Sequence, residues 1–297
     1  VNQTWRSRRS IMFVGGPNTR EDFHIEMGAE FFYQLRGNME LPTIQKGARK
    51  VVRIGQGQVF LLPARVPHSP QRPEKNSLGL VIERRRNKHE MDALRFYTDP
   101  AKCNQPLWER YFYCADLGKD LKPVIAEWLE SAELKSRTVT ETSLPDTKLI
   151  QERDDVEVPD PINLEEWVEA HAGELAEDGA SLPLFPGHPD SETQIFIQGA
   201  AASEEAWREE AELETFFFQI KGVSTVRVSG SAPGQEGSDA ADETQPNSSS
   251  EEPEAKKRLA VTEHELGEQS CFVVAPGQRF VATREAGAVC MVVTQGK

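Results

Sequence analysis

The chain has 297 residues, a formal net charge of −14 and a hydrophobic fraction of 38%. This length allows one large or two medium domains with a real hydrophobic core. No apolar run approaches the roughly 20 residues of a membrane span, which excludes a transmembrane protein. The sequence pI near 5.0 and the lack of a stripe of interleaved basic and aromatic residues exclude nucleic acid as a partner.

The charge is unevenly distributed, because residues 1–100 hold 17 Lys and Arg residues against 10 Asp and Glu residues. A basic first domain suits an anionic ligand, since such a field raises the rate of encounter. The four cysteines form no Cys-x-x-Cys pair, so we expect neither a zinc ribbon nor a disulfide framework, and a reducing cytosol is the simplest location. The start of the chain lacks an initiator Met and a secretory signal, and we interpret it as a fragment or an unusual gene model.

Short β-rich runs bounded by Gly, Pro or Asn predict strands over most of residues 11–86. Their spacing favours an antiparallel sandwich or barrel. We expect the arginines 84–86 to be the solvated end of the last of these strands. The runs are IMFVGG at 11–16, EFFYQL at 30–35, ARKVVRI at 48–54, QVFLLPA at 58–64 and LGLVIERR at 78–85.

Beyond these strands the pattern changes to helix at residues 119–137, where apolar side chains at helical spacing predict core packing. These side chains are Leu121, Val124, Ile125, Trp128 and Leu129.

A polar, acidic stretch at 138–154 indicates a linker. A second helix is expected near Asn163, because Asn163 and Glu166 form a plausible capping pair. Trp167 and Leu175 would then face the core. These features predict a first domain at 1–137, a linker at 138–154 and a second domain at 155–297.

Two segments of the first domain hold candidate metal ligands: His24 and Glu30 lie in one, and His68 in the other. Two neutral imidazoles and one carboxylate suit a divalent metal with open coordination positions, which is typical of non-heme Fe(II) and oxygen chemistry. A lone histidine is more often an ordinary buried residue, but two spaced segments of this kind favour a metal site. Glu26, two residues after His24, is either a group that orients a ligand or a solvent-facing carboxylate.

The second half of the chain repeats the first. The run FFFQIKG at 216–222 aligns with FFYQLRG at 31–37, and LGEQSCFVVAPGQRF at 266–280 aligns with IGQGQVFLLPARVP at 54–67. This alignment puts Glu209, Thr215 and Val281 (or Phe280) in place of His24, Glu30 and His68. These residues cannot hold iron, so the repeat predicts a second domain that keeps the fold and has lost the metal.

Residues 230–257 fit neither repeat, because they are rich in Ser, Glu, Pro and Gly. Such a composition cannot bury enough apolar surface to order. We expect a disordered acidic insertion in a surface loop between two strands of the second domain. A long surface loop is tolerated because its closure entropy grows slowly with length.

The two metal-ligand segments resemble the motifs of the cupin superfamily, G-x5-H-x-H-x3-4-E-x6-G and G-x5-P-x-G-x2-H-x3-N. Three positions depart from these motifs: Glu26 replaces a histidine, Arg65 a glycine and Arg72 the final asparagine. More narrowly, GGPNTREDFHIE, FFYQLRGNMEL and FLLPARVPHSPQR look like the 3-hydroxyanthranilate 3,4-dioxygenase family. This resemblance implies a mainly β chain with two cupin (jelly-roll β-barrel) domains and a few helices. It also implies a monomer, as for the two-cupin animal members.

The same resemblance implies an Fe(II) enzyme that opens the ring of 3-hydroxyanthranilate with O2 to give 2-amino-3-carboxymuconate semialdehyde in the kynurenine pathway. His24, Glu30 and His68 would hold the iron, with Glu30 also beside the substrate. Arg20 and Arg72 match the family's carboxylate-binding arginines, for which a guanidinium is well suited. Glu83 matches a family glutamate that contacts the substrate and serves in proton transfer.

Two other functions use some of the same residues. A cupin isomerase or a different cupin dioxygenase would use this metal site, but it does not predict the paired Arg20 and Arg72. A non-enzymatic cupin that binds or stores a ligand predicts that both halves have lost their ligands, whereas only the second half has.

Overall fold

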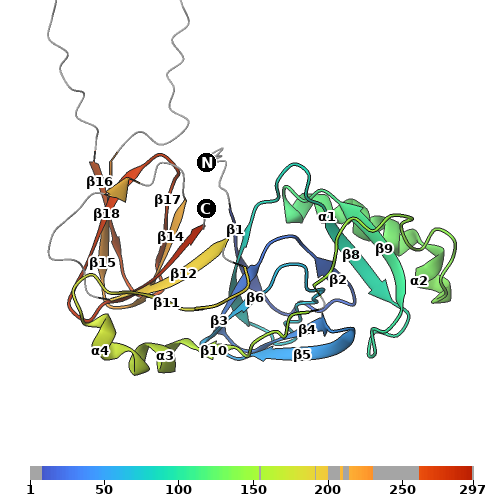
Figure 1. The fold of residues 1–297 in the computed structure, drawn as a ribbon, viewed down its shortest axis with the longest axis horizontal. Coiled ribbons are helices and arrows are strands. Elements are labelled where there is room, and N and C mark those ends of the chain that lie inside the picture. Colours follow the sequence, from blue (N-terminus) through green and yellow to red (C-terminus); the bar gives the residue numbers. More distant parts are fainter. Residues whose placement is uncertain are drawn as a thin grey trace, which may run out of the picture. The chain divides into compact units, whose positions relative to one another are not determined.

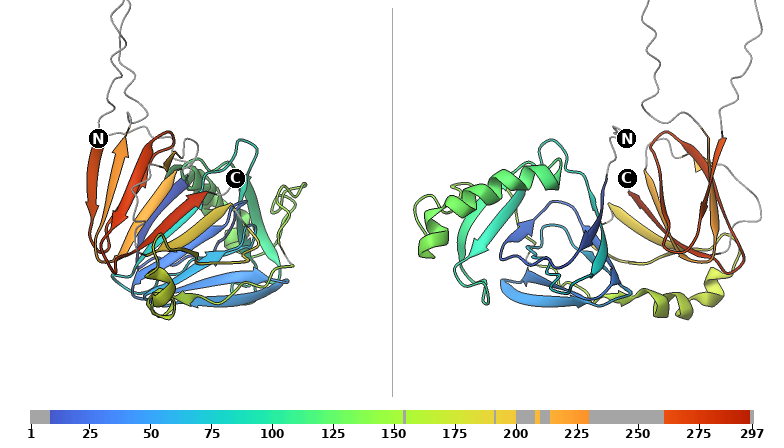
Figure 2. Two further views of the ribbon diagram at one scale, coloured as in Figure 1. Left: turned by 60° about the vertical axis from the view of Figure 1, so that its left-hand side comes forward. Right: turned by 180° about the vertical axis from the view of Figure 1, so that it is seen from behind.

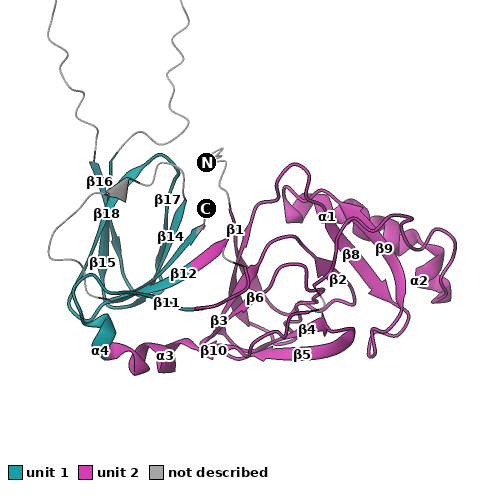
Figure 3. Ribbon diagram, viewed as in Figure 1, with its two compact units in different colours: residues 1–7, 173–184, 195–294 teal, residues 8–172, 185–194, 295–297 magenta. Residues whose placement is uncertain are grey.

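The computed structural model describes residues 9–153, 155–190, 192–199, 208–209, 214–229 and 261–295 (Figure 1). Antiparallel strands dominate this part of the chain, which confirms the prediction of a mainly β protein. None of its helices is long and apolar enough to cross a membrane. The contacts divide the chain into two compact units, an N-terminal unit of residues 8–172 and 185–194 and a C-terminal unit of residues 173–184 and 195–294 (Figure 3).

The N-terminal unit contains three antiparallel sheets. The largest has the strand order β1-β7-β3-β6-β10, the second has the order β2-β8-β9, and the third is the β4–β5 hairpin. Their bounds are β1 Arg9–Gly15, β2 Phe23–Ile25, β3 Glu30–Arg36, β4 Met39–Gln45, β5 Ala48–Ile54, β6 Gln58–Leu62, β7 Leu78–Arg84, β8 Asp92–Tyr97, β9 Pro106–Phe112 and β10 Ile162–Asn163. The strands predicted from the sequence correspond to β1, β3, β5, β6 and β7.

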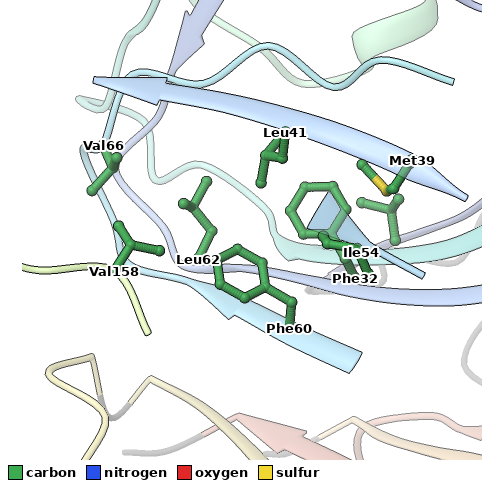
Figure 4. Packing of buried hydrophobic residues seen from close by; sticks show 9 residues of the cluster. Phe32, Met39, Leu41, Ile54, Phe60, Leu62, Val66 and Val158 are labelled. Carbon is green, nitrogen blue, oxygen red and sulfur yellow. The ribbon is translucent and has the colours of Figure 1, made fainter. Parts of the chain in front are cut away.

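The core of this unit lies between the large sheet and the β4–β5 hairpin (Figure 4). Phe32 on β3 and Phe60 on β6 are at most 1% exposed, and complete burial of such a side chain contributes about 1.5–3 kcal/mol. The other members of the cluster are Met39, Leu41, Ile54, Leu62, Val66, Val81 and Val158.

The predicted helix at 119–137 forms as two helices, α1 (Leu117–Glu130) and α2 (Ala132–Ser136), because Ser131 ends the first and caps the second. Both lie outside the β8–β9 hairpin (Figure 2), and Trp128 stacks on Phe96 with 3.8 Å between the ring centroids. The expectation that Leu129 packs in the core is wrong, because this side chain is exposed.

The division between the units differs from the boundary near residue 155. Val158 belongs to the core of the N-terminal unit, and Ile162 pairs with Val59 of β6. The predicted linker also packs on this unit, since Ser143 accepts a hydrogen bond from the Glu109 amide at 3.0 Å and Ile150 is buried. Residues 138–172 therefore complete the N-terminal unit.

The second predicted helix begins where expected. Asn163 precedes α3 (Leu164–Ala170) and accepts hydrogen bonds from the amides of Glu165 and Glu166, which confirms the cap. Leu164 is buried, while Trp167 is only half-buried and stacks on His171.

The C-terminal unit contains two antiparallel sheets, with strand orders β11-β12-β19-β14-β17 and β13-β18-β15-β16. Its core includes Phe217, Val226, Phe280 and Val292. The bounds are α4 Ala172–Leu175, β11 Ser181–Pro183, β12 Thr193–Gln198, β13 Arg208–Glu209, β14 Thr215–Lys221, β15 Ser224–Ser229, β16 Val261–Leu266, β17 Cys271–Val274, β18 Arg279–Arg284 and β19 Val289–Gln295.

The two units share the arrangement of strands around their central strands, β3 and β14. Strand β3 lies between β7 and β6, and β14 lies between β19 and β17 in the same order. Both central strands have a register shift, after Gln34 in one and after Gln219 in the other. At each shift the glutamine amide donates to a carbonyl two residues on, at 2.9 Å and 2.8 Å. The internal repeat predicted from the sequence is therefore present in the described residues.

The acidic insertion predicted at 230–257 lies outside the described residues. The strands that flank it, β15 and β16, are paired, with Ser229 opposite Val261. The hairpin β4–β5 of the N-terminal unit closes at the matching place with the short turn Lys46–Gly47.

Candidate metal centre and substrate cavity

The two candidate histidine ligands face each other on neighbouring extended segments. The amide of His24 on β2 donates to the His68 carbonyl at 2.8 Å, and the His68 amide donates back at 3.0 Å. This reciprocal pairing places the two imidazole centroids 5.6 Å apart. Both side chains are buried, so the β-pairing brings together two histidines that are 44 residues apart in the sequence.

Glu30, the first residue of β3, lies against His68, with 2.8 Å between Glu30 Oε2 and His68 Nε2. His68 donates from Nδ1 to the Val66 carbonyl at 2.9 Å, which leaves Nε2 as the nitrogen able to bind a cation. Burial alone would raise the pKa of Glu30, but His68, with help from His24 and Arg86, lowers the pKa below its usual value. Glu30 is thus a buried, ionised ligand candidate.

His24 is held differently from His68. Its Nε2 lies 2.7 Å from Oδ2 of Asp92, a fully buried carboxylate at the start of β8. A neutral imidazole has one donor and one acceptor nitrogen, so His24 Nδ1 is the nitrogen able to bind a cation. The structure therefore brings Glu30 and His68 into direct contact, while His24 lies beside them with one nitrogen on Asp92.

A cavity of about 120 Å³ joins the candidate ligands to the two predicted arginines. Its lining combines polar and apolar residues. The polar residues are Asn18, Arg20, His24, Glu30, His68 and Arg72, and the apolar residues are Met12, Val14, Phe32, Pro70, Val81 and Leu117.

Arg72 carries a buried guanidinium whose Nε and Nη2 have no hydrogen-bond partner. Burial lowers the pKa of Arg72, and the charge of Glu30 offsets part of this effect. Gly79 makes room for the guanidinium, since a Cβ at this position would lie 3.0 Å from Arg72 Nη2 and 2.8 Å from Gln34 Oε1. The local packing thus maintains a cation that the protein itself does not neutralise by a hydrogen bond.

Arg20 differs from Arg72, because it is partly exposed and donates from Nε to Asp22 at 2.8 Å. Gln71 holds its backbone, accepting from the Arg20 amide at 2.9 Å and donating to the Arg20 carbonyl at 2.7 Å. Both arginines line the cavity, but only Arg72 is an unpaired buried donor.

Comparison with known proteins agrees with this arrangement. A family model described as 3-hydroxyanthranilic acid dioxygenase matches residues 3–129. A 3-hydroxyanthranilate 3,4-dioxygenase from Rattus norvegicus is 42% identical over 233 residues, which cover 76% of this chain and 75% of the relative. The Homo sapiens enzyme of the same name is 40% identical over 223 residues, covering 74% of this chain and 73% of the relative. The chain belongs to the 3-hydroxyanthranilate 3,4-dioxygenase family.

A solved structure extends the fold comparison to the second half of this family member. Salicylate 1,2-dioxygenase from Pseudoaminobacter salicylatoxidans covers 99% of this chain, with a TM-score of 0.53 and 12% sequence identity, over 70% of its own chain. At this identity the likeness shows the fold alone. The family and the mainly β fold predicted from the sequence are both confirmed.

The remaining predicted site residue, Glu83, lies on β7 directly opposite Glu30 on β3. It is buried, and its Oε2 lies 3.1 Å from Nη1 of Arg86. It is not among the residues that line the cavity. The carboxylate oxygens of Glu26, Glu30 and Glu83 lie within 4.8 Å of one another, so this family member has a dense cluster of acidic groups behind its cavity.

The structure excludes one of the two alternatives for Glu26, and the expectation that the arginines 84–86 are all solvated is wrong. Glu26 is not solvent-facing: it is buried and pairs with Arg86. Burial raises the pKa of Glu26 despite the opposing charge of Arg86. The arginines at the end of β7 are not all solvated either, because Arg84 and Arg86 are buried and ion-paired, while Arg85 is exposed.

Sequence reasoning missed Asp92 and Arg86, which hold His24 and Glu83. The signal available for Asp92 was a single carboxylate at the start of the apolar run DALRFY. An isolated charge at the start of an apolar strand is rarely fully buried unless it is paired.

The C-terminal unit has no matching ligand set in its described strands. Arg208 pairs with Phe280 as His24 pairs with His68, and Thr215 occupies the register position of Glu30. The structure therefore selects Phe280 over Val281 as the counterpart of His68, and Arg208 in place of Glu209 as the counterpart of His24. A cationic guanidinium and a phenyl ring cannot replace two imidazole ligands.

Proposed function

We propose that the chain is a ring-opening dioxygenase that acts on 3-hydroxyanthranilate with O2, as the names of its relatives state for those proteins. The observation that carries this proposal is the buried, unpaired guanidinium of Arg72 in the same cavity as His24, Glu30 and His68. A cavity that combines a metal-ligand set with a free cation suits a small aromatic acid.

We propose His24, Glu30 and His68 as the metal ligands and iron(II) as the metal. Two imidazoles and one carboxylate form the facial ligand set of non-heme iron oxygenases. Two ligands about 2.1 Å from a metal and at right angles to each other are about 3 Å apart, and His68 Nε2 and Glu30 Oε2 are separated by 2.8 Å. The separation of Glu30 and His68 fits two ligands of one divalent cation, with His24 beside them as the proposed third ligand, and bound iron(II) would supply the redox chemistry with O2.

Arg72 binds the substrate carboxylate in this proposal, and Arg20, which also lines the cavity, supports it. A guanidinium and a carboxylate form two parallel charge-assisted hydrogen bonds, and Arg72 has two free N–H groups for this purpose. Pairing also removes the cost of an isolated buried charge. This contact fixes which edge of the ring points toward the three metal ligands.

The apolar residues of the cavity lining contact the aromatic ring of the substrate in this proposal. The volume of the cavity, about 120 Å³, is close to that of cavities of about 150 Å³ that accept benzene. Val14 and Phe32 from β1 and β3 and Leu117 from the start of α1 contribute to this lining. A close-fitting apolar wall excludes water and selects a single-ring substrate.

Glu83 is proposed as the proton-transfer group. It is buried beside Glu30 and held by Arg86, so its carboxylate has a fixed position behind the cavity. Glu83 stands opposite Glu30, which lines the cavity, and in this proposal it takes up the proton released from the substrate hydroxyl.

The wider context belongs to the same proposal. The unpaired cysteines Cys103, Cys114, Cys271 and Cys290 fit a reducing cytosol. A monomer is proposed, since the repeat already supplies two cupin units in one chain. The product would enter the kynurenine pathway toward quinolinate.

Oxygen uptake with 3-hydroxyanthranilate tests this function on the iron-loaded full chain. The expected result is O2 consumption that depends on both iron and substrate and is lost in His68→Ala. If one Fe(II) is bound but no O2 is consumed with this substrate, the proposal fails and a different cupin metalloenzyme becomes the better assignment. If no divalent metal binds, a non-enzymatic cupin remains.

A further inference from the structure

Arg86 contacts three buried carboxylates, those of Asp92, Glu26 and Glu83. Its Nε and Nη2 donate to the two oxygens of Asp92 at 2.8 Å and 2.7 Å. Nη2 also pairs with Glu26. Nη1 lies 3.1 Å from Glu83 and donates to the Arg84 carbonyl at 3.1 Å. Three of these contacts are hydrogen bonds, two to Asp92 and one to the Arg84 carbonyl, and the contacts with Glu26 and Glu83 are ion pairs.

Each of these carboxylates is connected to a residue of the proposed metal centre. Asp92 accepts from His24 at 2.7 Å. Glu83 stands opposite Glu30 in the β3–β7 register. Glu26 is two residues after His24, directly past the end of β2. One side chain therefore ties together β2, β7 and β8, the strands that surround the candidate ligands.

We propose that Arg86 is a positioning residue for the metal centre, which fixes the imidazole of His24 through Asp92 and the carboxylate of Glu83 directly. This inference rests on the proposed ligand set. Without the guanidinium, Asp92 would have no fixed counter-charge, and His24 would lose the partner that sets its ring orientation and tautomer. Groups that orient a ligand in this way control metal affinity.

A lysine cannot replace Arg86 in this role. An ammonium group has three donors at one point, whereas the guanidinium binds Asp92 through two parallel hydrogen bonds and reaches two further carboxylates. Arg86→Lys therefore keeps the positive charge and removes the geometry. The Arg86→Lys variant therefore distinguishes a role in positioning the ligands from a role in charge balance alone.

Arg95 offers a matched control for a purely structural role. It is buried like Arg86 and pairs with Glu109 and Glu152. It does not contact the cavity or any candidate ligand in the part of the chain that the structure describes. Arg95→Lys should thus lose comparable stability and leave the metal centre unchanged.

The test is a titration of Co(II) into the metal-free full chain, with affinity and visible absorption spectrum as readouts. We expect Arg86→Lys to weaken Co(II) binding by about 10- to 100-fold and to change the spectrum of the bound ion. Arg95→Lys should keep the wild-type affinity and spectrum. Thermal unfolding of each metal-free variant shows whether both lysine variants are folded and equally destabilised.

Asp92→Asn provides a second route to the answer if Arg86→Lys does not fold. It keeps the volume of Asp92 and removes the charge that joins Arg86 to His24, so it should weaken Co(II) binding to a similar extent. Wild-type affinity and spectrum in a folded Arg86→Lys or in Asp92→Asn would overturn the inference and leave Arg86 with a structural role alone.

His68→Ala distinguishes failure of this inference from failure of the proposed ligand set. If His68→Ala loses Co(II) binding while the Arg86 and Asp92 variants keep it, only the role of Arg86 is refuted. If His68→Ala binds Co(II) like the wild type, the ligand set is wrong, and the inference about Arg86 fails with it.

Discussion

The N-terminal and C-terminal units share the strand order and register around their central strands, β3 and β14, but differ in the residues at the positions of the candidate ligands. At three matching positions one unit has His24, Glu30 and His68, and the other has Arg208, Thr215 and Phe280. The β-pairing that brings the candidate ligands together in one unit is preserved in the other, whose described strands hold no matching ligand set. The fold is therefore specified independently of the metal site.

Both units have an apolar core and a buried glutamine on the central strand. The glutamine at the register shift is fully buried in each unit, and its side chain donates to the same carbonyl position. A β-bulge of this kind redirects the strand and leaves a polar group to satisfy. Gln34 and Gln219 are thus common to both units, whereas the cluster of Glu26, Glu30 and Glu83 lies in the N-terminal unit.

The largest effect is expected when His68 of the N-terminal unit is replaced by phenylalanine, the residue at the matching position 280 of the C-terminal unit. His68→Phe should abolish metal binding and lower turnover by more than about 100-fold, because even residues that only orient a ligand contribute 10- to 100-fold. Metal content after dialysis and O2 uptake measure this effect. The reverse change, Phe280→His, is the control and should create no metal site, since Arg208 and Thr215 supply no ligand. Turnover at the wild-type rate in His68→Phe would refute the ligand assignment.

Arg72→Met should have opposite effects on function and stability. Hydrogen bonds to charged groups contribute about 1.5–3 kcal/mol, so kcat/KM should fall by about 10- to 100-fold, mainly through KM. The substrate-free protein should unfold at a higher temperature than the wild type, because an unpaired buried charge has been removed. Arg20→Met is the matched control, with little gain in stability because Arg20 is partly exposed and paired with Asp22. A loss of stability in Arg72→Met would contradict the unpaired state of the guanidinium.

Gly79 differs from the residue at the matching position of the C-terminal unit, and the effect of a single added Cβ atom can be tested there. Gly79 stands opposite Gln34, and in the C-terminal unit the residue opposite Gln219 is Cys290. The N-terminal unit has no room for a side chain here, because Gln34 Oε1 and the Arg72 guanidinium occupy the space. Gly79→Ala should displace Arg72 and raise KM by about 5- to 30-fold, corresponding to about 1–2 kcal/mol, with the bound metal retained. An unchanged KM would show that the guanidinium can move without loss of substrate binding.

The sequence predicted the parts of this molecule that depend on local pattern. Alternating apolar strands and the run LLPARVPHSPQR placed β3, β6 and the His68 segment correctly, and the repeat of FFYQLRG identified the second unit. Burial of charged residues could not be predicted in this way, because the Arg86 cluster is assembled from β2, β7 and β8. In the sequence Arg86 resembles a surface arginine, because its partner Glu26 is distant in the chain and nothing in the local pattern shows that Asp92 is buried beside it.

The smallest effect concerns an ion pair away from the cavity. Burial would raise the pKa of Glu152, but the hydrogen bonds and charges of Arg95 and Lys148 together outweigh burial and lower the pKa. A carboxyl with a lowered folded-state pKa stabilises the protein above its unfolded value of about 4.3 and loses this contribution as pH falls through the folded value. Glu152→Gln should therefore lower Tm by about 2–4 °C at pH 7, and the difference should shrink as pH falls from about 5 toward 2. Thermal unfolding followed by circular dichroism measures this trend. A difference in Tm that stays constant over this range would show that packing, and not the charge of Glu152, accounts for its contribution.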